Sequence, residues 1–460
     1  MRIKFLSVIV SFLLVSFAMS SCLGDDDPVE YSPNSMLMAF ELDTVHGVNY
    51  KFTIDQLTGK IYNVDSLPVG SDTIIDKIRI TKLSVSGFVT IRNHANTGDS
   101  VFNMEDSVNL VGTMEILPDG KPGKPFKFKV WTMDMKYSKD YSLYVRVHQQ
   151  VPDSLQWGKD AMKVDFAPTI TGKQKSIIYK EQIFTYAANS PVYSTNLSDG
   201  RNWTSGAASG LPSTDLTSIV TFRGLLYATV EGSGKVYSSE DGRTWNEVPS
   251  FGEVIRLISP MNKGLSGEIL TGIKTFIPEN VERFCTTEDG SDWTPGEIAP
   301  HSFPRNNISV TTYNNIVGVE NVAVVGNVID PVEKVDTATV VWAYMEGQEW
   351  VALNTESKYS CPLLKDPSVM YYGGAFYVFG KDFKTFYKSE AGLVWNEVKS
   401  KFMFPVATPS SENSEATRGF RGKESDYSMV VDKDHFIWIM RSTPNEVWRG
   451  RLNRLGFKVQ

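Results

Sequence analysis

The sequence predicts an all-β protein in which a β-sandwich precedes a six-bladed β-propeller, and two observations carry this prediction. The first is a recurring segment made of an aromatic residue, small polar residues, an acid, Gly and Trp. Its copies read VYSTNLSDGRNW (192–203), VYSSEDGRTW (236–245), FCTTEDGSDW (284–293) and, in weaker form, AYMEGQEW (343–350) and FYKSEAGLVW (386–395). One hairpin signature in each period of roughly forty to fifty residues is typical of a propeller. The second observation is period-two alternation before residue 155, which indicates half-buried strands.

From about Lys173 onward the chain divides into six units of four short strands. The first two units comprise residues 176–180, 182–187, 191–195 and 202–205, and then 216–222, 225–230, 235–239 and 244–248. The next three run over 254–297, 308–354 and 368–399, and the sixth uses 427–432, 436–440, 446–451 and 457–460. Six four-stranded units close a ring and leave only short edges, so residues 173–460 are predicted to form a six-bladed propeller.

The recurring hairpin resembles the Asp box, Ser-x-Asp-x-Gly-x-Thr-Trp, of sialidases and of many non-enzymatic propellers such as photosystem assembly factors. The nearest copy, residues 238–245, has Glu240 at the usual Asp position. In such a turn the acid accepts backbone N–H groups, Gly adopts a positive φ, and Trp packs between neighbouring blades. A structural role, not ligand contact, is therefore expected for Asp199, Gly200, Trp203, Asp241, Gly242, Trp245, Asp289, Gly290 and Trp293.

Residues 31–155 are predicted to form an immunoglobulin-like β-sandwich, followed by a linker over 156–172. The clearest alternation is Tyr141–Val147, and turn signals such as 96–99 and 118–123 separate the candidate strands. No cysteine pair marks the sandwich, so the assignment rests on strand number and spacing alone.

The N-terminus predicts export and lipidation. Arg2 and Lys4 precede an apolar run over 5–19 that is shorter than a membrane span, so residues 1–21 read as a signal peptide. Ser20-Ser21-Cys22 resembles a lipobox, in which Cys22 carries the lipid. The acidic tether over 22–30, with Asp25–Asp27, resembles the surface-export signal of Bacteroidetes lipoproteins. The expected location is the outer membrane, exposed at the cell surface; the alternative is an ordinary secretory signal with an incidental cysteine.

The composition argues against several classes of partner and cofactor. The net charge of −7 and the absence of a basic cluster argue against nucleic acid. No Cys/His cluster suggests a metal, and no cofactor is expected. Cys285 and Cys361 could pair in an oxidising compartment, but buried free thiols are the favoured interpretation.

No catalytic residues stand out. A sialidase needs three axial arginines, but the first propeller unit reads IFTYAA (183–188) without one. The chain as a whole resembles two-domain surface lipoproteins of gut Bacteroidetes, so a binding or scaffold module for a glycan or protein ligand is predicted. The alternatives are a glycoside hydrolase with acids on the propeller axis and an assembly factor of an outer-membrane complex. Ligand contact is expected from two crossings between units, at His301, Phe303, Arg305, Phe404, Arg418 and Arg421.

Overall fold

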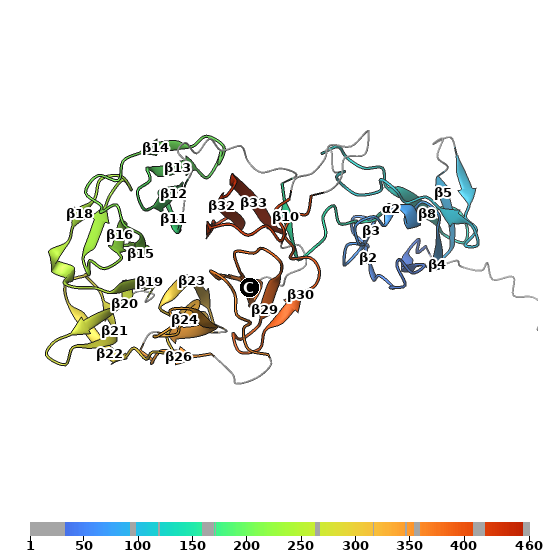
Figure 1. Ribbon diagram of the computed structural model, residues 1–460. Coiled ribbons are helices and arrows are strands. Elements are labelled where there is room, and N and C mark those ends of the chain that lie inside the picture. The colour runs from blue at the N-terminus through green and yellow to red at the C-terminus, as the bar shows by residue number, and fades with distance from the viewer. Residues whose placement is uncertain are drawn as a thin grey trace, which may run out of the picture. The chain divides into compact units, whose positions relative to one another are not determined.

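The computed structural model describes residues 33–92, 98–117, 120–158, 170, 172–262, 267–315, 317–345, 347–353, 359–407 and 419–453 (Figure 1). The chain divides into two compact units between Val151 and Pro152. Apart from one helical turn, α2 (Asp72–Ile75), and one 3-10 turn, η1 (Pro249–Phe251), the regular structure of the described residues is β. In that part of the chain no helix is both long and apolar enough to cross a membrane.

The N-terminal unit contains two sheets around one core. One sheet has the order β1 (Leu37–Leu42), β4 (Ile78–Val85), β7 (Ser107–Val108). The other has the order β2 (Phe52–Asp55), β3 (Lys60–Asn63), β9 (Ser138–Tyr144), β8 (Phe126–Trp131), β5 (Phe88–Arg92), β6 (Asp99–Val101). Phe40 of the first sheet packs edge-on against Phe128 of the second, so the alternating apolar residues of both sheets share a core. The pairing of β3 with β9 is parallel.

The C-terminal unit contains six four-stranded sheets in the described residues, here numbered sheet 1 to sheet 6. Sheet 1 comprises β11 (Gln174–Tyr179), β12 (Gln182–Ala187), β13 (Val192–Asn196) and β14 (Thr204–Gly206). Sheet 2 comprises β15 (Leu216–Phe222), β16 (Leu225–Val230), β17 (Val236–Ser239) and β18 (Asn246–Glu247). Sheet 3 comprises β19 (Arg256–Asn262), β20 (Glu268–Phe276), β21 (Val281–Thr287) and β22 (Trp293–Ile298).

Sheets 4 and 5 follow the same chain order. Sheet 4 comprises β23 (Asn306–Asn314), β24 (Glu320–Ile329), β25 (Asp336–Met345) and β26 (Val351–Ala352). Sheet 5 comprises β27 (Ser368–Tyr372), β28 (Ala375–Phe379), β29 (Phe386–Ser389) and β30 (Asn396–Val398). The strands of sheets 1 and 2 lie close to the predicted strand ranges, and sheets 3 to 5 lie close to the predicted units 254–297, 308–354 and 368–399. In Figure 1 the sheets lie around a common centre, and the labelled first strands β11, β15, β19 and β23 are innermost in their sheets.

Sheet 6 differs from the prediction in the origin of its fourth strand. Its order is β10 (Ser154–Trp157), β33 (Asn445–Asn453), β32 (Phe436–Ser442), β31 (Tyr427–Val431). The fourth strand is thus β10, from residues that the sequence analysis divided between the sandwich and a linker. The predicted strand 457–460 lies outside the described residues. A four-residue strand paired with a distant partner leaves no local signal, which is why the pattern along the chain missed it.

Trp157 fixes β10 in place. Its indole Nε1 donates a hydrogen bond to the Met403 carbonyl (2.7 Å), and its ring packs edge-on against Phe420. The segment joining sheets 5 and 6 is therefore attached to the closing strand at both of its described ends. Phe402, Phe404 and Phe420, on this segment, are all buried.

The acid–Gly–Trp turns join the third and fourth strands of sheets 1, 2 and 3. The Asp241 carboxylate accepts the N–H groups of Thr244 (2.7 Å) and Arg243 (2.8 Å), and these bonds hold its pKa at about 2. Asp289 likewise accepts the N–H groups of Asp292 (3.0 Å) and Ser291 (2.8 Å). In sheet 2 the acid that accepts these bonds is thus Asp241, directly before Gly242, and not Glu240, which occupies the Asp position of the Asp-box pattern.

The third such acid and its neighbours follow the same plan. Asp199 accepts hydrogen bonds from the backbone and the side-chain amide of Asn202 (3.2 and 2.6 Å). Gly200 has φ 63° and Trp203 donates to its carbonyl (3.1 Å). Trp203 packs on the core cluster that contains Tyr193 of sheet 1 and Trp438 of sheet 6.

Glycine and tryptophan in these turns connect neighbouring sheets. A Cβ on Gly242 (φ 75°) would lie 2.7 Å from the Phe184 ring of sheet 1, and one on Gly290 (φ 89°) would lie 2.2 Å from the Phe251 ring. Trp245 is buried and meets Tyr186 of sheet 1 edge-on at 5.8 Å. Trp293 meets Phe251 in the same way at 5.9 Å. The turns therefore combine local capping with packing between sheets.

Neither of the two cysteines in the described residues forms a disulfide. Cys285 is buried in sheet 3, and Cys361 is half-buried on the segment that leads to sheet 5.

We predict that Trp157→Ala destabilises the C-terminal unit by about 3 kcal/mol or more, because it removes a packed indole from the closing strand. Chemical denaturation of the mature protein followed by circular dichroism measures this change. Val332→Ala, at a side chain that is 85 % exposed on the loop between β24 and β25, is the control and should be neutral. An unchanged midpoint for the Trp157 variant would contradict closure by β10.

We predict that Asp241→Ala lowers the melting temperature at pH 7 by roughly 2–4 °C, as the loss of about 1 kcal/mol of hydrogen bonding does in a domain of this size. The folded-state pKa of about 2 lies below the ordinary value of 3.8, so the stabilisation is complete above pH 4. It is lost as the pH falls through 2. Melting curves from pH 7 to pH 2 should therefore converge for wild type and variant.

Glu240→Ala, in the same turn, is the matched control for this pH series. No side-chain hydrogen bond of Glu240 is present in the described residues, so its removal should not change the pH dependence. If the melting temperatures of wild type and Asp241→Ala still differed at pH 2 as much as at pH 7, the role given to the ionised carboxylate would be contradicted.

Candidate functional site

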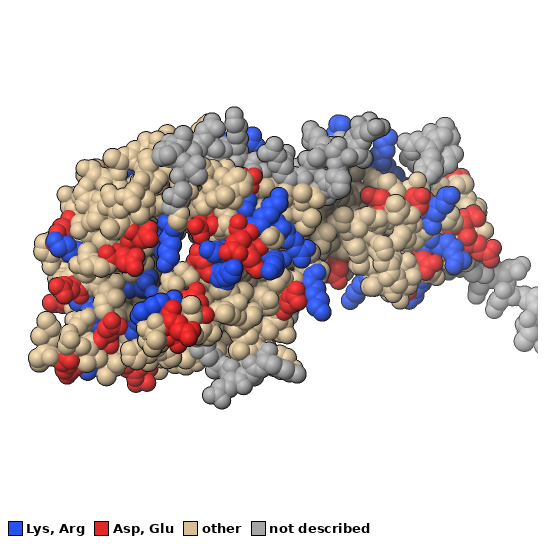
Figure 2. Space-filling view, viewed as in Figure 1, with Lys and Arg blue, Asp and Glu red and all other residues tan. Residues whose placement is uncertain are grey.

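Two adjoining cavities lie on the axis of the C-terminal unit, where the first strands of the sheets begin. They measure about 200 and 140 Å³ and share Lys175, Arg256 and Asp366 in their linings. The crossings between sheets lead into this same end of the unit. Figure 2 shows charged side chains gathered around a hollow at its centre. We call the two cavities together the axial cavity.

Two cations, one from sheet 1 and one from sheet 3, line the axial cavity. Lys175 lies on β11, and its Nζ donates to the Ile308 carbonyl (3.2 Å). Burial, with the nearby Arg256 as the second cause, lowers the pKa of Lys175 to about 8. Arg256 opens β19 and donates from Nη1 to the Thr217 carbonyl (2.6 Å). Burial lowers its pKa to about 10, with Arg305 as the second cause. Each of these shifts records a charge held away from bulk water and close to another positive charge.

Arg305 adds a third cation from the crossing between sheets 3 and 4. Its Nη2 forms an ion pair with Glu282 (2.8 Å) and donates to the Ala299 carbonyl (3.2 Å). Its Nη1 is enclosed and has no hydrogen-bond partner within the described part of the chain. An enclosed donor without an acceptor is costly, so this nitrogen marks a place where a ligand acceptor would fit.

Asp366 faces the cations from the other side of the axis. It precedes β27 with a left-handed φ of 48°, and the Tyr427 hydroxyl donates to its carbonyl (2.9 Å). Burial raises the pKa of its carboxyl group, an effect that the nearby Lys175 opposes. Among the described residues its carboxylate forms no hydrogen bond or ion pair.

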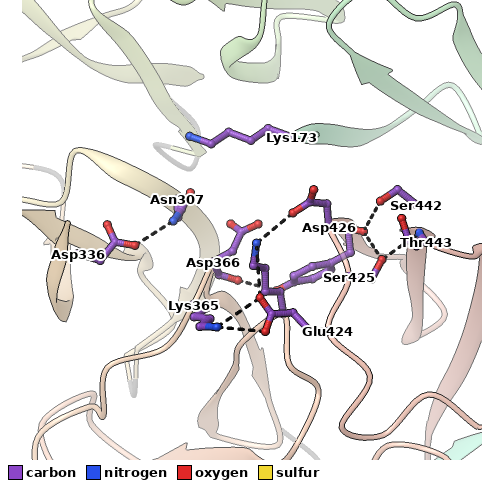
Figure 3. Close-up of polar contacts among 12 residues, drawn as sticks. Lys173, Asn307, Asp336, Lys365, Asp366, Glu424, Ser425, Asp426, Ser442 and Thr443 are labelled. Atoms are coloured by element: carbon purple, nitrogen blue, oxygen red, sulfur yellow. Dashed lines mark hydrogen bonds and ion pairs between the residues drawn. The ribbon is translucent and has the colours of Figure 1, made fainter. Parts of the chain in front are cut away.

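A rim of paired charges surrounds the opening (Figure 3). Lys173 extends across the opening from sheet 1 and donates from Nζ to the Asn306 side chain (3.0 Å). On the opposite side, Asp426 pairs with Lys381 (3.1 Å) and Glu424 pairs with Lys365 (3.1 Å). The rim charges thus have partners, in contrast to the Asp366 carboxylate and the Arg305 Nη1 group.

This arrangement is suited to holding a polar ligand. It offers enclosed cationic donors, one enclosed carboxylate and a narrow space. No group of three or more metal-binding side chains is found in the ranges that the structure describes.

Phe303 and Phe404, predicted to contact ligand, are core residues instead. Phe303 is fully buried between Phe284 (4.9 Å) and Trp342 (5.5 Å). Phe404 is 2 % exposed and stacks on Phe386 (4.4 Å). Both crossings fold back between sheets, because burying a phenylalanine ring stabilises the fold more than exposing it to solvent.

The other four residues predicted to contact a ligand do not lie together at one site. Arg305 lines the axial cavity. His301 is exposed on the crossing surface, and Arg421 is exposed and donates from Nε to the Lys384 carbonyl (3.0 Å). Arg418 lies outside the described residues, as does Cys22.

Sequence reasoning missed Lys175, Arg256 and Asp366. The available signal was a charged residue at the start of the first strand of a unit, as in KQKSII (173–178) and EVIRLI (253–258). Strands of this kind line the axis, so a charge there is unusual and points inward. Attention to long crossings and aromatic residues obscured this signal.

A larger groove of about 800 Å³ lies between sheets 3 and 4, at the end with the acid–Gly–Trp turns. It includes Glu297 and Glu349, whose mutual hydrogen bond raises the pKa of Glu297. Both side chains are exposed to solvent, so this pair is more weakly organised than the charges on the axis.

No curated protein matches the chain in sequence. Among solved structures, an auxiliary nutrient binding protein from Bacteroides ovatus is 8 % identical, with a TM-score of 0.44 over 81 % of this chain and 94 % of that chain. A second auxiliary nutrient binding protein, from Bacteroides thetaiotaomicron, is 8 % identical, with a TM-score of 0.38 over 92 % and 99 %. A protein of unknown function from the same species is 12 % identical, with a TM-score of 0.41 over 92 % and 100 %.

Two family models match the chain over nearly all of its length. The N-terminal domain of DUF6242, a domain of unknown function, matches residues 28–145. The DUF6242 beta propeller domain matches residues 151–460, a range that includes β10. The chain therefore belongs to the DUF6242 family, with a β-propeller as its C-terminal domain.

Proposed function

We propose that this protein is a binding module displayed at the cell surface, and that its ligand enters the axial cavity of a six-bladed propeller. In this proposal each four-stranded sheet is one blade, and the N-terminal unit is an immunoglobulin-like spacer. Lipidated Cys22 anchors the chain in the outer membrane through the acidic tether over 22–30. A glycan is the ligand class that we favour, because the cavity lining is polar and hydroxyl-rich, with Ser176, Ser218, Ser309 and Ser428.

The observation that carries the proposal is that Lys175 and Arg256, both half-buried, line the same narrow cavity on the axis. Two like charges held close together away from water destabilise a fold. Neutral side chains at these positions would be more stable, so the charges fit a functional explanation better than a structural one. A bound ligand that accepts hydrogen bonds would relieve the cost.

A second candidate function is glycoside hydrolysis. Asp366 supports it, because a buried carboxyl group with a raised pKa suits a general acid, and Asp426 contributes to that shift. The candidate is weaker because such a reaction needs a second free carboxylate, and Asp426 is paired with Lys381.

We predict that the mature protein binds at least one member of an array of neutral and acidic oligosaccharides. Arg256→Met should weaken that binding tenfold or more, as the loss of a charged hydrogen-bond donor does. Lys334→Met, at an exposed lysine on the loop between β24 and β25, is the matched control and should bind as wild type does. Each bound glycan is also incubated with the protein and analysed for new reducing ends.

The outcomes separate the candidates. Binding without cleavage supports a binding module. Cleavage that Asp366→Asn abolishes would establish the hydrolase instead. An array without any bound glycan, or binding that Arg256→Met leaves intact, would contradict the proposed site.

We predict that Cys22→Ala moves the protein from the membrane fraction to the soluble fraction, because the lipid is the proposed anchor. Cell fractionation with immunoblotting, and protease accessibility of intact cells, measure anchoring and surface exposure separately. Ser21→Ala, which keeps a small residue before Cys22, is the control and should remain in the membrane. A Cys22 variant that still fractionates with the membrane would refute lipidation.

A further inference from the structure

In the lining of the narrower part of the axial cavity four cations stand against three acids, and Arg305 is also paired with Glu282 outside that lining. Besides Arg305 and Arg256, the narrower part of the axial cavity is lined by Lys173 and Lys175 on the positive side. The acids in the same lining are Asp215, Glu231 and Asp366. Only Asp366 acts on Lys175 as an opposing charge, and only Glu231 acts on Arg256. In each case another cation is the larger electrostatic influence.

The donors of these cations are also only partly used. Lys175 donates to one carbonyl, at 3.2 Å, although an ammonium group has three N–H donors. Arg256 reaches the Arg305 carbonyl with Nη2 only at 3.5 Å. Arg305 has the enclosed Nη1 without an acceptor. Three guanidinium and ammonium groups with spare donors, converging on one cavity, are suited to an oxyanion.

Resting on the proposed function, we infer that the axial cavity binds the carboxylate of an acidic sugar, held by Lys175, Arg256 and Arg305. The remaining polar lining receives the hydroxyl groups of the same sugar ring. Asp366, on the opposite side of the axis, accepts a hydroxyl proton or, when protonated, donates its own. Lys173 then covers the ligand at the opening. Cavities of about 200 and 140 Å³ have room only for an end unit of a glycan.

The test is isothermal titration calorimetry of the full mature protein with three probes that differ in charge. D-glucuronate carries the carboxylate, its methyl ester has the same ring without the charge, and acetate has the charge without the ring. Glucuronate should bind at least tenfold more tightly than either of the other two. Comparable binding of the methyl ester would overturn the anion site, and comparable binding of acetate would overturn the sugar assignment.

Two variants test the assigned residues. Lys175→Met and Arg305→Gln should each weaken glucuronate binding about tenfold or more, whereas Lys334→Met should not. Melting curves of the ligand-free proteins show whether each variant is folded. Because the two residues are changed one at a time, each folded variant tests the site independently. Unchanged glucuronate affinity in both folded variants would overturn the assignment.

A pH series adds a readout specific to Lys175. The probe carboxylate remains ionised across the range, and the Arg256 guanidinium, whose pKa is lowered to about 10, is still mostly protonated at pH 9.5. Of the groups facing Lys175, Lys173 is exposed, and Asp366 becomes more fully ionised as the pH rises. Lys175 loses its proton above about pH 8, so affinity should be several-fold lower at pH 9.5 than at pH 6.5. In Lys175→Met this decrease should be much smaller; an equal decrease would argue against Lys175.

Failure of this inference is distinguishable from failure of the proposed function. A protein that binds neutral glycans on the array through Arg256, but not glucuronate, retains the binding function and loses the acidic-sugar assignment. A protein that binds no glycan at all loses both.

Discussion

Closure of the ring depends on one antiparallel ladder between the two ends of the propeller chain. Ser154 pairs with Asn453 and Trp157 pairs with Gly450. Without β10, the outer edge of β33 would expose unpaired N–H and C=O groups along a long strand. The absence of a side chain at Gly450 makes this contact feasible, since a Cβ there would lie 2.9 Å from both Leu155 and Trp157. The identity of one small residue therefore permits the closing strand to dock.

The charged groups at the two ends of the sheets differ in their hydrogen bonding, although the buried Trp245 indole N–H of one turn also has no partner among the described residues. At the end with the acid–Gly–Trp turns, carboxylates such as Asp241 and Asp289 are saturated by backbone N–H groups of their own turns. At the end where the first strands begin, the Arg305 Nη1 group and the Asp366 carboxylate keep unused capacity in the described structure. Saturated groups stabilise a fold, and unsaturated enclosed groups are available for a ligand. This contrast favours the axis over the turns as the binding end.

Burying the axial charges is unfavourable for the free energy of folding, so the rest of the unit must supply an opposing stabilisation. Removing one ion from water costs several kcal/mol even after relaxation. Aromatic residues between sheets supply a large opposing term, because fully burying one such side chain contributes about 1.5–3 kcal/mol. Phe303 and Phe404 belong to this stabilising set, which explains why the crossings that carry them point inward and not toward a ligand.

The sequence by itself determined the elements that depend on neighbours along the chain. The alternation and the acid–Gly–Trp hairpins identified the strands of sheets 1 and 2, the extents of sheets 3 to 5 and the turns, because both signals act within a few residues. Only the tertiary structure decided what depends on distant partners: the pairing of Ser154–Trp157 with β33, the burial of Phe303 and Phe404, and the meeting of Lys175, Arg256 and Asp366 on one axis. Those three charges lie on different sheets or crossings, and ring closure alone brings them within reach of one another. No local pattern encodes that proximity, because it is a property of the closed ring.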